Sequence, residues 1–373
     1  MRSDIDTFDD LRRRFVAFAN QSDSAATTIP PQSYALPEVL DLETSTIFEK
    51  EWICLGRQEE IPQPGDYFTS ELAGEPLLVV RGDDGTIRVL SNICRHKWTQ
   101  VAQGKGNAKL FVCPYHAWSY GRNGRLVNAR YMDRTEGFVK EECALPELRC
   151  ELWHGFIFVN LDPDAVPLAE KLNNLEPLVA GHRMAEMSLF TGEDEVWACN
   201  WKILVENFTE GYHTFQTHAK SLQNATPTDL TYWGHDDPAF SAFYSPTGPD
   251  EVVREPHSPD LDETQRKTVL MICSFPSHVM ALAPDRVFYM CITPQGVGHV
   301  RTKWGVASYG EEFSNDNREN IARFYRQVNE EDRVTLERIQ QGVGSRFARP
   351  GRMSWLETTN MHFGRYIARK LAA

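Results

Sequence analysis

Apolar residues near the start of the chain recur with the period of an amphipathic helix. Across residues 6–20 they fall on one helical face, at Phe8, Leu11, Phe15 and Phe18. The polar stretch 21–28 and the pair Pro30-Pro31 predict the end of this helix, and a second helix is predicted over residues 40–50. We therefore expect a helical lead-in segment ahead of the first compact domain.

Short apolar runs that alternate with glycine and proline follow Trp52. They cover residues 77–80, 87–90, 110–113 and 156–159, with turn pairs such as Asp84-Gly85 and Asn123-Gly124 among them. Regularly spaced runs with such turns are typical of hairpins. The pattern predicts a small antiparallel β domain.

The pattern changes beyond residue 160. Helical periodicity covers residues 168–180 and 203–218, strand-like runs cover 269–273, 287–292 and 299–306, and a long charged helix is expected over about 317–342. This mixture predicts an α+β domain whose sheet is backed by helices. The segment 236–266 is rich in Pro, Asp and Glu, and we interpret it as a long loop or lid over a site.

Composition narrows the class of protein. With 373 residues, 41% of them hydrophobic, the chain can form two cores and is not a disordered chain. Its 39 basic residues against 52 acidic ones give a net charge of −13. This charge argues against nucleic acid or an anionic membrane as a partner and favours a cationic substrate or partner.

The first residues also bear on location. Four aspartates by position 10 are unlike a secretory signal or a transit peptide, and no uncharged run is long enough to span a membrane. We therefore expect a cytoplasmic protein. In that reducing compartment the eight cysteines are expected to be thiols or metal ligands rather than disulfides.

Two short Cys/His pairs form the first candidate metal site. Cys94-x-His96 and Cys113-x-x-His116 are separated by sixteen residues. Two thiolates and two imidazoles can hold one tetrahedral zinc, or a [2Fe-2S] cluster with both thiolates on one iron and both imidazoles on the other. Zinc knuckles usually pair like with like, whereas each pair here contributes one Cys and one His. The pattern therefore favours the cluster over zinc and over four incidental core residues.

The neighbours of these pairs carry a family resemblance. Cys94-Arg95-His96 and Cys113-Pro114-Tyr115-His116-Ala117-Trp118 resemble the Rieske motif of ring-hydroxylating oxygenase α subunits. The resemblance implies that the two Cys and two His of the motif bind the cluster. Tyr115 and Trp118 are interpreted as packing aromatics or as hydrogen-bond partners near the sulfurs. The family usually has Arg after the first His, where this chain has Lys97 followed by Trp98, and neither departure touches a ligand.

A second candidate centre contains His213 and His218, at the end of the predicted helix 203–218. On a regular helix two residues five positions apart point more than a right angle apart, so both reach one metal only if the helix distorts or ends between them. Two histidines and a carboxylate with open positions are the ligands of dioxygen-activating ferrous iron. Without the first motif, buried core histidines would be the plainer interpretation.

The carboxylate of such a site is not adjacent in the sequence, and Asp332 is the best candidate. The segment from Glu331 to Gly342 resembles the Glu-Asp-x4-Glu-x2-Gln-x-Gly segment of the same family, in which that Asp completes the iron site. Glu331 is one helical step away and is expected to point elsewhere. A solvated charge on a charged helix is the alternative for Asp332.

Two further residues are matched through the resemblance. Glu210 occupies the position of an acidic residue that bridges the cluster of a neighbouring subunit to the catalytic iron, where a carboxylate fixes both rings and shortens the electron path. An exposed helix residue is the alternative. Asn207 resembles an amide near the iron, with ordinary capping or packing as the alternative. Glu at position 210 and the tail Gly351-Arg352-Met353 resemble the carnitine and glycine-betaine oxygenases.

The resemblance implies an α+β fold in two parts. These are a small antiparallel β Rieske domain and a helix-grip (START-like) catalytic domain with an antiparallel sheet. We expect residues 1–45 to be a helical lead-in that packs on the catalytic domain. Residues 46–160 are then the Rieske [2Fe-2S] domain, and residues 161–373 the catalytic mononuclear iron domain.

The implied activity is that of a terminal oxygenase. An NAD(P)H-dependent reductase, with or without a separate ferredoxin, would supply electrons through the [2Fe-2S] cluster to a mononuclear Fe(II), which activates O2 and oxygenates a small organic substrate. The family's assembly implies a homotrimer. No GxGxxG motif stands in a strand–turn–helix context, so the chain must borrow its electrons. The alternatives are a non-catalytic Rieske electron carrier and a zinc-stabilised helix-grip binding module.

The substrate is predicted only as a class. Several aromatic residues could line a pocket, namely Trp233, Phe240, Phe243, Tyr244, Phe288, Tyr289 and Trp304, although most of them are expected in the core. Such walls suit a quaternary ammonium by cation–π attraction or a flat ring by stacking. We expect a quaternary amine such as a betaine or carnitine, with C–N cleaving monooxygenation. Hydroxylation, dihydroxylation or demethylation of an aromatic acid is the alternative.

Overall fold

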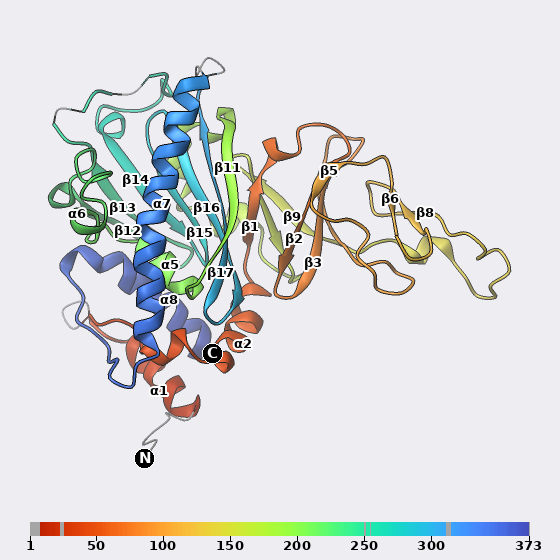
Figure 1. Ribbon diagram of the computed structural model, residues 1–373, viewed down its shortest axis with the longest axis horizontal. Helices are drawn as coiled ribbons and strands as arrows, with labels where there is room; N and C mark the ends of the chain where they lie inside the picture. Colours follow the sequence, from red (N-terminus) through yellow and green to blue (C-terminus); the bar gives the residue numbers. More distant parts are fainter. Residues whose placement is uncertain (1–7, 23–25, 250, 254, 311–314, 373) are drawn as a thin grey trace. The chain divides into compact units, whose positions relative to one another are not determined.

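The protein divides into two compact units in a computed structural model that describes residues 8–22, 26–249, 251–253, 255–310 and 315–372. The first unit combines Met1–Ile47 with Val166–Ala373, and the second is Phe48–Ala165. Each unit has its own antiparallel sheet (Figure 1).

The first unit is a seven-stranded antiparallel sheet with helices. Its strand order is β11-β17-β16-β15-β14-β13-β12, so after β11 the chain runs through the sheet as a meander. The strands are β11 Ser188–Trp197, β12 Tyr232–Asp236, β13 Phe240–Pro246, β14 Thr268–Ser274, β15 His278–Leu282, β16 Arg286–Gly296 and β17 His299–Ser308. The helices are α1 Phe8–Ala19, α2 Pro37–Glu43, α3 Leu168–Lys171, α4 Glu176–Val179, α5 Trp201–Phe208, α6 Thr214–Thr217, α7 Asn315–Val343 and α8 Thr358–Ala372.

The long helix α7 lies across this sheet (Figure 1). It is strongly charged, yet it has a buried stripe at helical spacing, formed by Ala322, Val328, Asn329, Asp332 and Leu336. Asp332 is therefore on the core-facing side of the helix, and a solvated charge is excluded for it.

The N-terminal helices pack within the first unit. Leu11, Phe15 and Phe18 of α1 are buried, as the predicted apolar face required, and α1 contacts α8. A Cβ on Gly364 of α8 would come within 2.9 Å of the Phe18 ring, so this glycine allows the close approach. Residues 6 and 7 of the predicted helix, and the Phe8 side chain, lie outside the part that the structure describes.

The second unit is all β apart from short turns. Its main sheet has the order β1-β10-β9-β4-β3-β2-β5, and a separate three-stranded sheet is β6-β7-β8. The strands are β1 Ile53–Arg57, β2 Asp66–Leu72, β3 Glu75–Arg81, β4 Ile87–Ser91, β5 Lys105–Asn107, β6 Phe111–Val112, β7 Ser119–Tyr120, β8 Leu126–Asn128, β9 Glu147–Trp153 and β10 Phe156–Asn160. The predicted fold class, a small antiparallel β domain with an α+β helix-grip domain, is confirmed.

Three predicted elements differ from the structure for local reasons. The predicted helix 40–50 becomes a π turn after Glu43, where the Thr44 and Thr46 hydroxyls donate to the backbone oxygens of Leu40 and Leu42. The predicted helix 168–180 is two short helices, and Pro177 stands in the first turn of the second. The predicted loop 236–266 contains the buried strand β13, whose apolar residues lie between two prolines.

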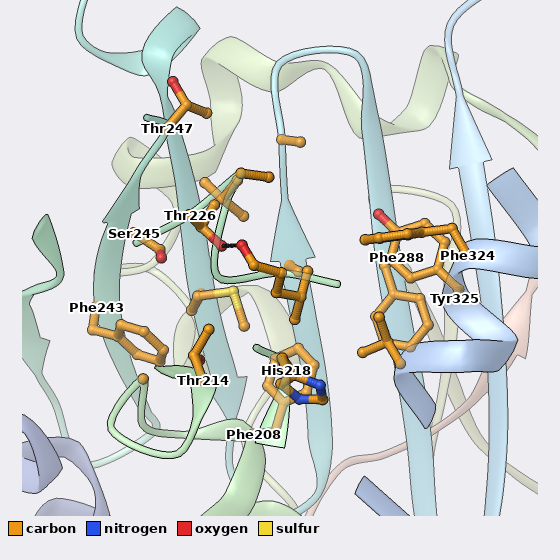
Figure 2. A pocket seen from close by; sticks show the side chains of 18 of the residues that line it. Phe208, Thr214, His218, Thr226, Phe243, Ser245, Thr247, Phe288, Phe324 and Tyr325 are labelled. Atoms are coloured by element: carbon orange, nitrogen blue, oxygen red, sulfur yellow. Dashed lines mark hydrogen bonds between the residues drawn. The ribbon is translucent and has the colours of Figure 1, made fainter. Parts of the chain in front are cut away.

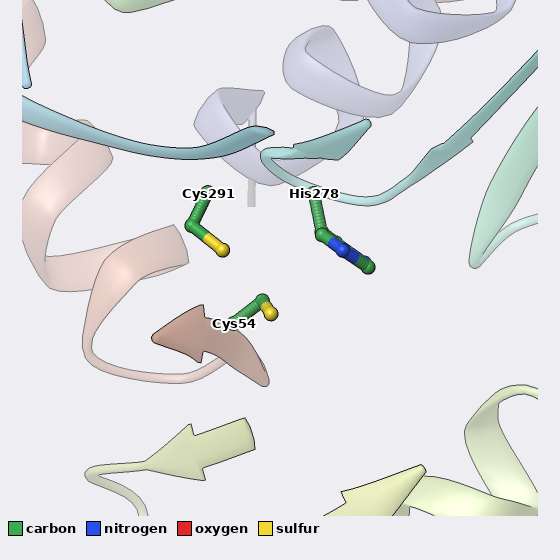
Figure 3. A group of neighbouring side chains, drawn as sticks. All are labelled: Cys54, His278 and Cys291. Carbon is green, nitrogen blue, oxygen red and sulfur yellow. The ribbon is translucent and has the colours of Figure 1, made fainter. Parts of the chain in front are cut away.

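The state of the cysteines and the search for membrane-spanning helices agree with the predictions from the sequence. All eight cysteines are free thiols. One of them, Cys291 on β16, is paired across the sheet with His278 on β15, and both are buried (Figure 3). No helix in the described residues is long and apolar enough to cross a membrane.

A buried ion pair joins the N-terminal segment to α5, and it generates the first prediction. Lys202 Nζ lies 2.6 Å from Glu43 Oε1, both side chains are fully buried, and Trp201 Nε1 donates to Glu43 Oε2 at 2.8 Å. Burial raises the pKa of Glu43, and Lys202 opposes that shift. Lys202→Met leaves this carboxylate buried without its cation and is expected to lower the free energy of unfolding by about 3–5 kcal/mol.

Urea unfolding measures this loss. The matched control is Lys267→Met, which removes an exposed ion pair with Glu263 and is expected to change stability by less than about 1 kcal/mol. Adding Glu43→Gln to Lys202→Met should recover part of the loss. Equal effects of the two lysine variants would contradict the role of the buried pair.

Candidate metal centres and active site

Two histidines reach one point because the helix between them is interrupted. Helix α5 is capped at its start by the Asn200 side chain and ends at Phe208. The short turn α6 follows, with His213 at its N-cap and His218 at its C-cap. A Cβ on Gly211, inside the break, would come within 3.2 Å of the Thr231 side chain, so a larger residue would press on Thr231 here. The predicted helix 203–218 is therefore broken where a shared site needs it to be.

The two imidazoles converge on Asp332 of α7. His218 Nε2 lies 3.0 Å from Asp332 Oδ1, and His213 Nε2 lies 3.7 Å from the same oxygen. All three donor atoms are within 4.8 Å of one another. Asp332 Oδ1 is buried, and despite the 3.0 Å contact it has no partner in hydrogen-bond geometry. Three lone pairs directed at one point, rather than at one another, are what a metal ion requires.

Each histidine is held from behind by a carboxylate. His213 Nδ1 lies 2.6 Å from Glu210 Oε1, and His218 Nδ1 lies 2.8 Å from Glu331 Oε2, which also accepts from the Ser221 hydroxyl at 2.6 Å. A carboxylate on Nδ1 keeps the proton there and leaves Nε2 with a free lone pair. As predicted, Glu331 is not among the converging donor atoms. The sequence analysis missed that Glu331 orients the His218 ring from behind, for which the adjacent acids at 331 and 332 were the available signal.

The charges around this group are coupled. Burial works to lower the pKa of His213, but Glu210 and Asp332 outweigh it, and the pKa is raised. Burial works to raise the pKa of Glu331, but hydrogen bonds from His218, Ser221 and Gln327 lower it overall. Glu331 is therefore ionised at neutral pH and can accept a hydrogen bond from Nδ1 of His218.

A pocket opens beside the three converging side chains (Figure 2). His213, His218, Asp332, Asn207 and Glu210 all contribute to its lining. It encloses about 1240 Å³ when its open mouth is included, so its size admits either a small quaternary amine or an aromatic acid.

The aromatic prediction is only partly correct. Of the seven predicted residues, Phe243 and Phe288 line the pocket. Phe240, Tyr289 and Trp304 are buried, Trp233 is exposed and Tyr244 is partly buried, and none of these five lines it. The sequence analysis missed three aromatic residues that line the pocket, namely Phe208, Phe324 and Tyr325. Phe288 of β16 stacks on Tyr325 of α7 at 4.6 Å and on Phe208 of α5 at 6.3 Å between ring centroids, because both helices bring aromatic residues over the sheet.

In the second unit the two Cys/His pairs lie on matching loops. Cys94 N–H donates to Thr99 O, and Trp98 N–H donates back to Cys94 O. Cys113 makes the same two bonds with Trp118 and Ala117, and Trp98 and Ala117 both have a left-handed φ, of 55° and 58°. Two loops of one conformation therefore present two sets of ligands.

The donors of these loops separate by burial. Cys94 and Cys113 are buried in the apolar core of the unit, while His116 is exposed and His96 partly so. The His96 and His116 ring centroids are 4.6 Å apart, and His96 Nδ1 is buried without a hydrogen-bond partner. Thiols on the inner side and imidazoles on the outer side fit a two-iron cluster ligated by sulfur on one iron and nitrogen on the other.

Neighbouring aromatic residues support these ligands. Trp118 stacks on His96 at 4.9 Å, and Tyr115 lies 3.7 Å from His116 between centroids. Tyr120, which the sequence analysis missed, accepts from Arg95 N–H at 3.0 Å and lies 3.2 Å from Cys94 Sγ. Either the hydroxyl or a protonated thiol can donate in this contact, but a Cys94 thiolate that binds iron has no proton, so Tyr120 would then be the donor. Trp98 is 80% exposed and packs against none of the ligands.

Comparison with known proteins agrees with this division. Residues 181–373 match the family model described as ring hydroxylating alpha subunit (catalytic domain), and residues 51–159 match the Rieske [2Fe-2S] domain model. The carnitine monooxygenase oxygenase subunit of Acinetobacter pittii is 35% identical over 201 residues, 52% of this chain and 53% of the relative. The benzene 1,2-dioxygenase subunit alpha of Pseudomonas putida is 33% identical over 233 residues, 60% of this chain and 51% of the relative.

A solved structure supports the fold. A quaternary ammonium Rieske monooxygenase in complex with L-carnitine matches with a TM-score of 0.82 over 96% of this chain and 98% of that one, at 24% identity. This likeness concerns the fold. The matched region spans about half the length of each of the two relatives above.

A buried acid beside the site generates the second prediction. Tyr34 donates to Glu206, with its hydroxyl oxygen 2.6 and 2.9 Å from the two carboxylate oxygens. Burial raises the pKa of Glu206 from 4.5 to about 7, although Tyr34 and Lys202 oppose the shift. Between about pH 4.5 and 7, Glu206 therefore keeps its proton in the folded protein and has lost it in the unfolded chain. The contribution of Glu206 to the free energy of unfolding falls as pH rises through this range.

Glu206→Gln removes this dependence. The difference in the free energy of unfolding, variant minus wild type, is measured by chemical unfolding at pH 5 and at pH 8. It should be more favourable to the variant at pH 8 by on the order of 2–3 kcal/mol. The control Glu170→Gln changes an exposed carboxylate, and its difference from wild type should stay flat. If the stability difference between Glu206→Gln and wild type is equally independent of pH, the raised pKa of Glu206 is contradicted.

Proposed function

This chain belongs to the family of ring-hydroxylating oxygenase α subunits, and we propose that it is the terminal oxygenase component of a Rieske-type system acting on a small quaternary amine. Electrons from a partner NAD(P)H-dependent reductase, with or without a ferredoxin, enter through a [2Fe-2S] cluster held by Cys94, His96, Cys113 and His116. A mononuclear Fe(II) on His213, His218 and Asp332 is the site of reaction with O2. Residues 46–160 and 161–373 are the corresponding domains, with residues 1–45 as lead-in.

The observation that carries this proposal is the convergence of three donor atoms at the wall of a pocket. A carrier of electrons alone needs no ligand set of two Nε2 atoms and one carboxylate beside a cavity of this size. A zinc-stabilised binding module needs no second metal site at all. The convergence therefore favours the oxygenase over both alternatives.

The chemistry divides between the iron and the chain. His213, His218 and Asp332 would hold a ferrous iron, which would supply open positions for dioxygen and pass electrons to it. His213, His218 and Asp332 all line the pocket, so a metal held by them would be accessible to a bound substrate. Glu210 and Glu331 fix the two rings through Nδ1, so neither ring can turn its lone pair away.

Glu210 is also our candidate for the electron relay between subunits. Its side chain holds the His213 ring and is only 9% exposed, so it is not an ordinary surface carboxylate. We infer a homotrimer closed head to tail, in which Glu210 contacts a cluster histidine of the partner subunit. We further propose that the protein works in the cytoplasm.

The substrate class follows from the pocket walls and the relatives. Phe208, Phe288 and Tyr325 form a stack of aromatic rings that lines the pocket, and we propose that a quaternary ammonium gains cation–π attraction from it. A relative named as a carnitine monooxygenase oxygenase subunit supports the same class. For this chain we propose oxygenation next to nitrogen, with C–N cleavage. Flat aromatic acids are the second candidate, because the same walls could stack on a ring and a benzene dioxygenase subunit is also a relative.

Replacement of Asp332 tests the iron site, as the third prediction. Asp332→Ala removes one of three ligands and should lower substrate-stimulated oxygen uptake at least about 100-fold. Iron content should fall from three to two per chain, while the visible absorption of the cluster stays unchanged. Glu330→Ala, which removes an exposed partner of Arg333 on the same helix, is the control and should keep all three irons.

Retained oxygen uptake in Asp332→Ala would refute the assignment of this residue. A screen of wild-type enzyme with carnitine, glycine betaine and aromatic acids, measured as oxygen uptake with a surrogate reductase, tests the substrate class. Uptake stimulated by aromatic acids alone would replace the first candidate by the second.

A further inference from the structure

The pocket has two chemically different ends. Phe243, Met271, Ala281 and Phe288 form one row across four neighbouring strands, since each pairs with the next in the sheet register. Ser245 and Val269 form the next pair on the same face of β13 and β14, two residues along each strand. In Figure 2 His218 marks one end of the pocket, near the row that contains Phe243, and Thr247 marks the opposite end.

Arg266 lies at the end with Thr247. Thr247 N–H donates to the backbone oxygen of Lys267 at 2.9 Å, which fixes the turn Gln265–Lys267 next to this end of the pocket. Arg266 is in that turn and lines the pocket. The hydroxyl residues Thr226 and Ser245 line the same region (Figure 2).

The Arg266 guanidinium has no counterion within the part of the chain that the structure describes. Its Nε is buried and has no hydrogen-bond partner, and no carboxylate oxygen lies within 4.0 Å of it. Glu251 lines the same pocket but remains outside that distance. Lys267, the next residue, differs in being exposed and paired with Glu263 at 3.0 Å. A permanently charged fork of donors without a partner in a pocket is costly unless a ligand supplies the acceptor.

The metal end carries the opposite charge. Glu210, Glu331 and Asp332 are three carboxylates around the converging histidines, and a ferrous ion contributes only two positive charges. The surplus is one negative charge, which favours a cation and repels a second carboxylate at this end. The pocket is therefore polarised, with negative charge at the metal and positive charge at Arg266.

We propose that Arg266 binds the carboxylate of a zwitterionic substrate and thereby orients its quaternary ammonium toward the metal end. This inference rests on the proposed function and adds a specificity-determining residue to it. A planar guanidinium donates two parallel hydrogen bonds to a carboxylate. The Ser245 hydroxyl lines the same pocket as a further donor, whereas Thr226 and Thr247 donate to the backbone oxygens of Leu222 and Lys267. The substrate is then a trimethylammonium carboxylate rather than an amino alcohol such as choline or an uncharged aromatic compound.

Substitution at this position with a matched pair of substrates tests the inference. The holoenzyme with a surrogate reductase is assayed with L-carnitine and with its methyl ester, which keeps the ammonium and lacks the anion. Arg266→Gln should lower kcat/KM for carnitine about 10- to 100-fold, chiefly through KM, and change that for the ester less than about threefold. Arg266→Lys should recover part of the loss, because the charge returns without the fork.

The control is Lys267→Gln, one residue away, exposed and outside the pocket lining, which should leave both substrates unaffected. Titration calorimetry of each substrate against the same variants measures binding apart from turnover. Equal losses for acid and ester, or no loss for the acid, would overturn the role of Arg266.

Failure of the proposed substrate class is distinguishable from failure of this inference. If wild-type enzyme oxidises an aromatic acid and no quaternary amine, the pair is replaced by benzoate and benzamide. A selective loss of benzoate in Arg266→Gln would then support the anion site while the amine proposal fails. An equal effect on benzoate and benzamide would overturn the anion site too.

Discussion

The active region of this protein depends on the approach of two imidazole Nε2 atoms to one carboxylate oxygen. Three lone pairs within 4.8 Å would repel each other in an isolated peptide, and they are held together by contacts from outside the group. Glu210 and Glu331 hold the rings through Nδ1, the interruption between α5 and α6 lets both histidines face one point, and the buried stripe of α7 fixes Asp332. The fold therefore maintains an arrangement that is favourable only when a cation occupies its centre.

The same logic orders the pocket. The sheet supplies a row of apolar side chains as a floor, and α5 and α7 add aromatic residues above the metal ligands. The charged groups are confined to the two ends. A molecule that enters is therefore sorted by charge along its length as well as by shape, and the apolar middle restricts water near the reacting end.

Much of this could be predicted from sequence, and the limits have physical causes. The Cys/His pairs and the His-x4-His spacing were recognisable because metal ligation restricts both residue type and distance along the chain. The order of the strands in the sheet of the first unit could not be predicted, because strand pairing is a long-range property. The buried strand β13 was mistaken for part of a loop because its apolar residues lie between prolines. Glu331, Tyr120, Phe208 and Tyr325 act through contacts between distant segments, which periodicity does not reveal. The roles of the nine candidate residues, seven ligands together with Asn207 and Glu210, stay predictions, although the geometry of all nine is compatible with them.

Anomalous X-ray diffraction from crystals of the purified protein, collected on both sides of the iron absorption edge, tests the central claim most directly. The account predicts a single iron peak within bonding distance of His213 Nε2, His218 Nε2 and Asp332, and a separate two-iron peak between the loops of Cys94 and Cys113. Zinc at either position, or no peak among His213, His218 and Asp332, would contradict it.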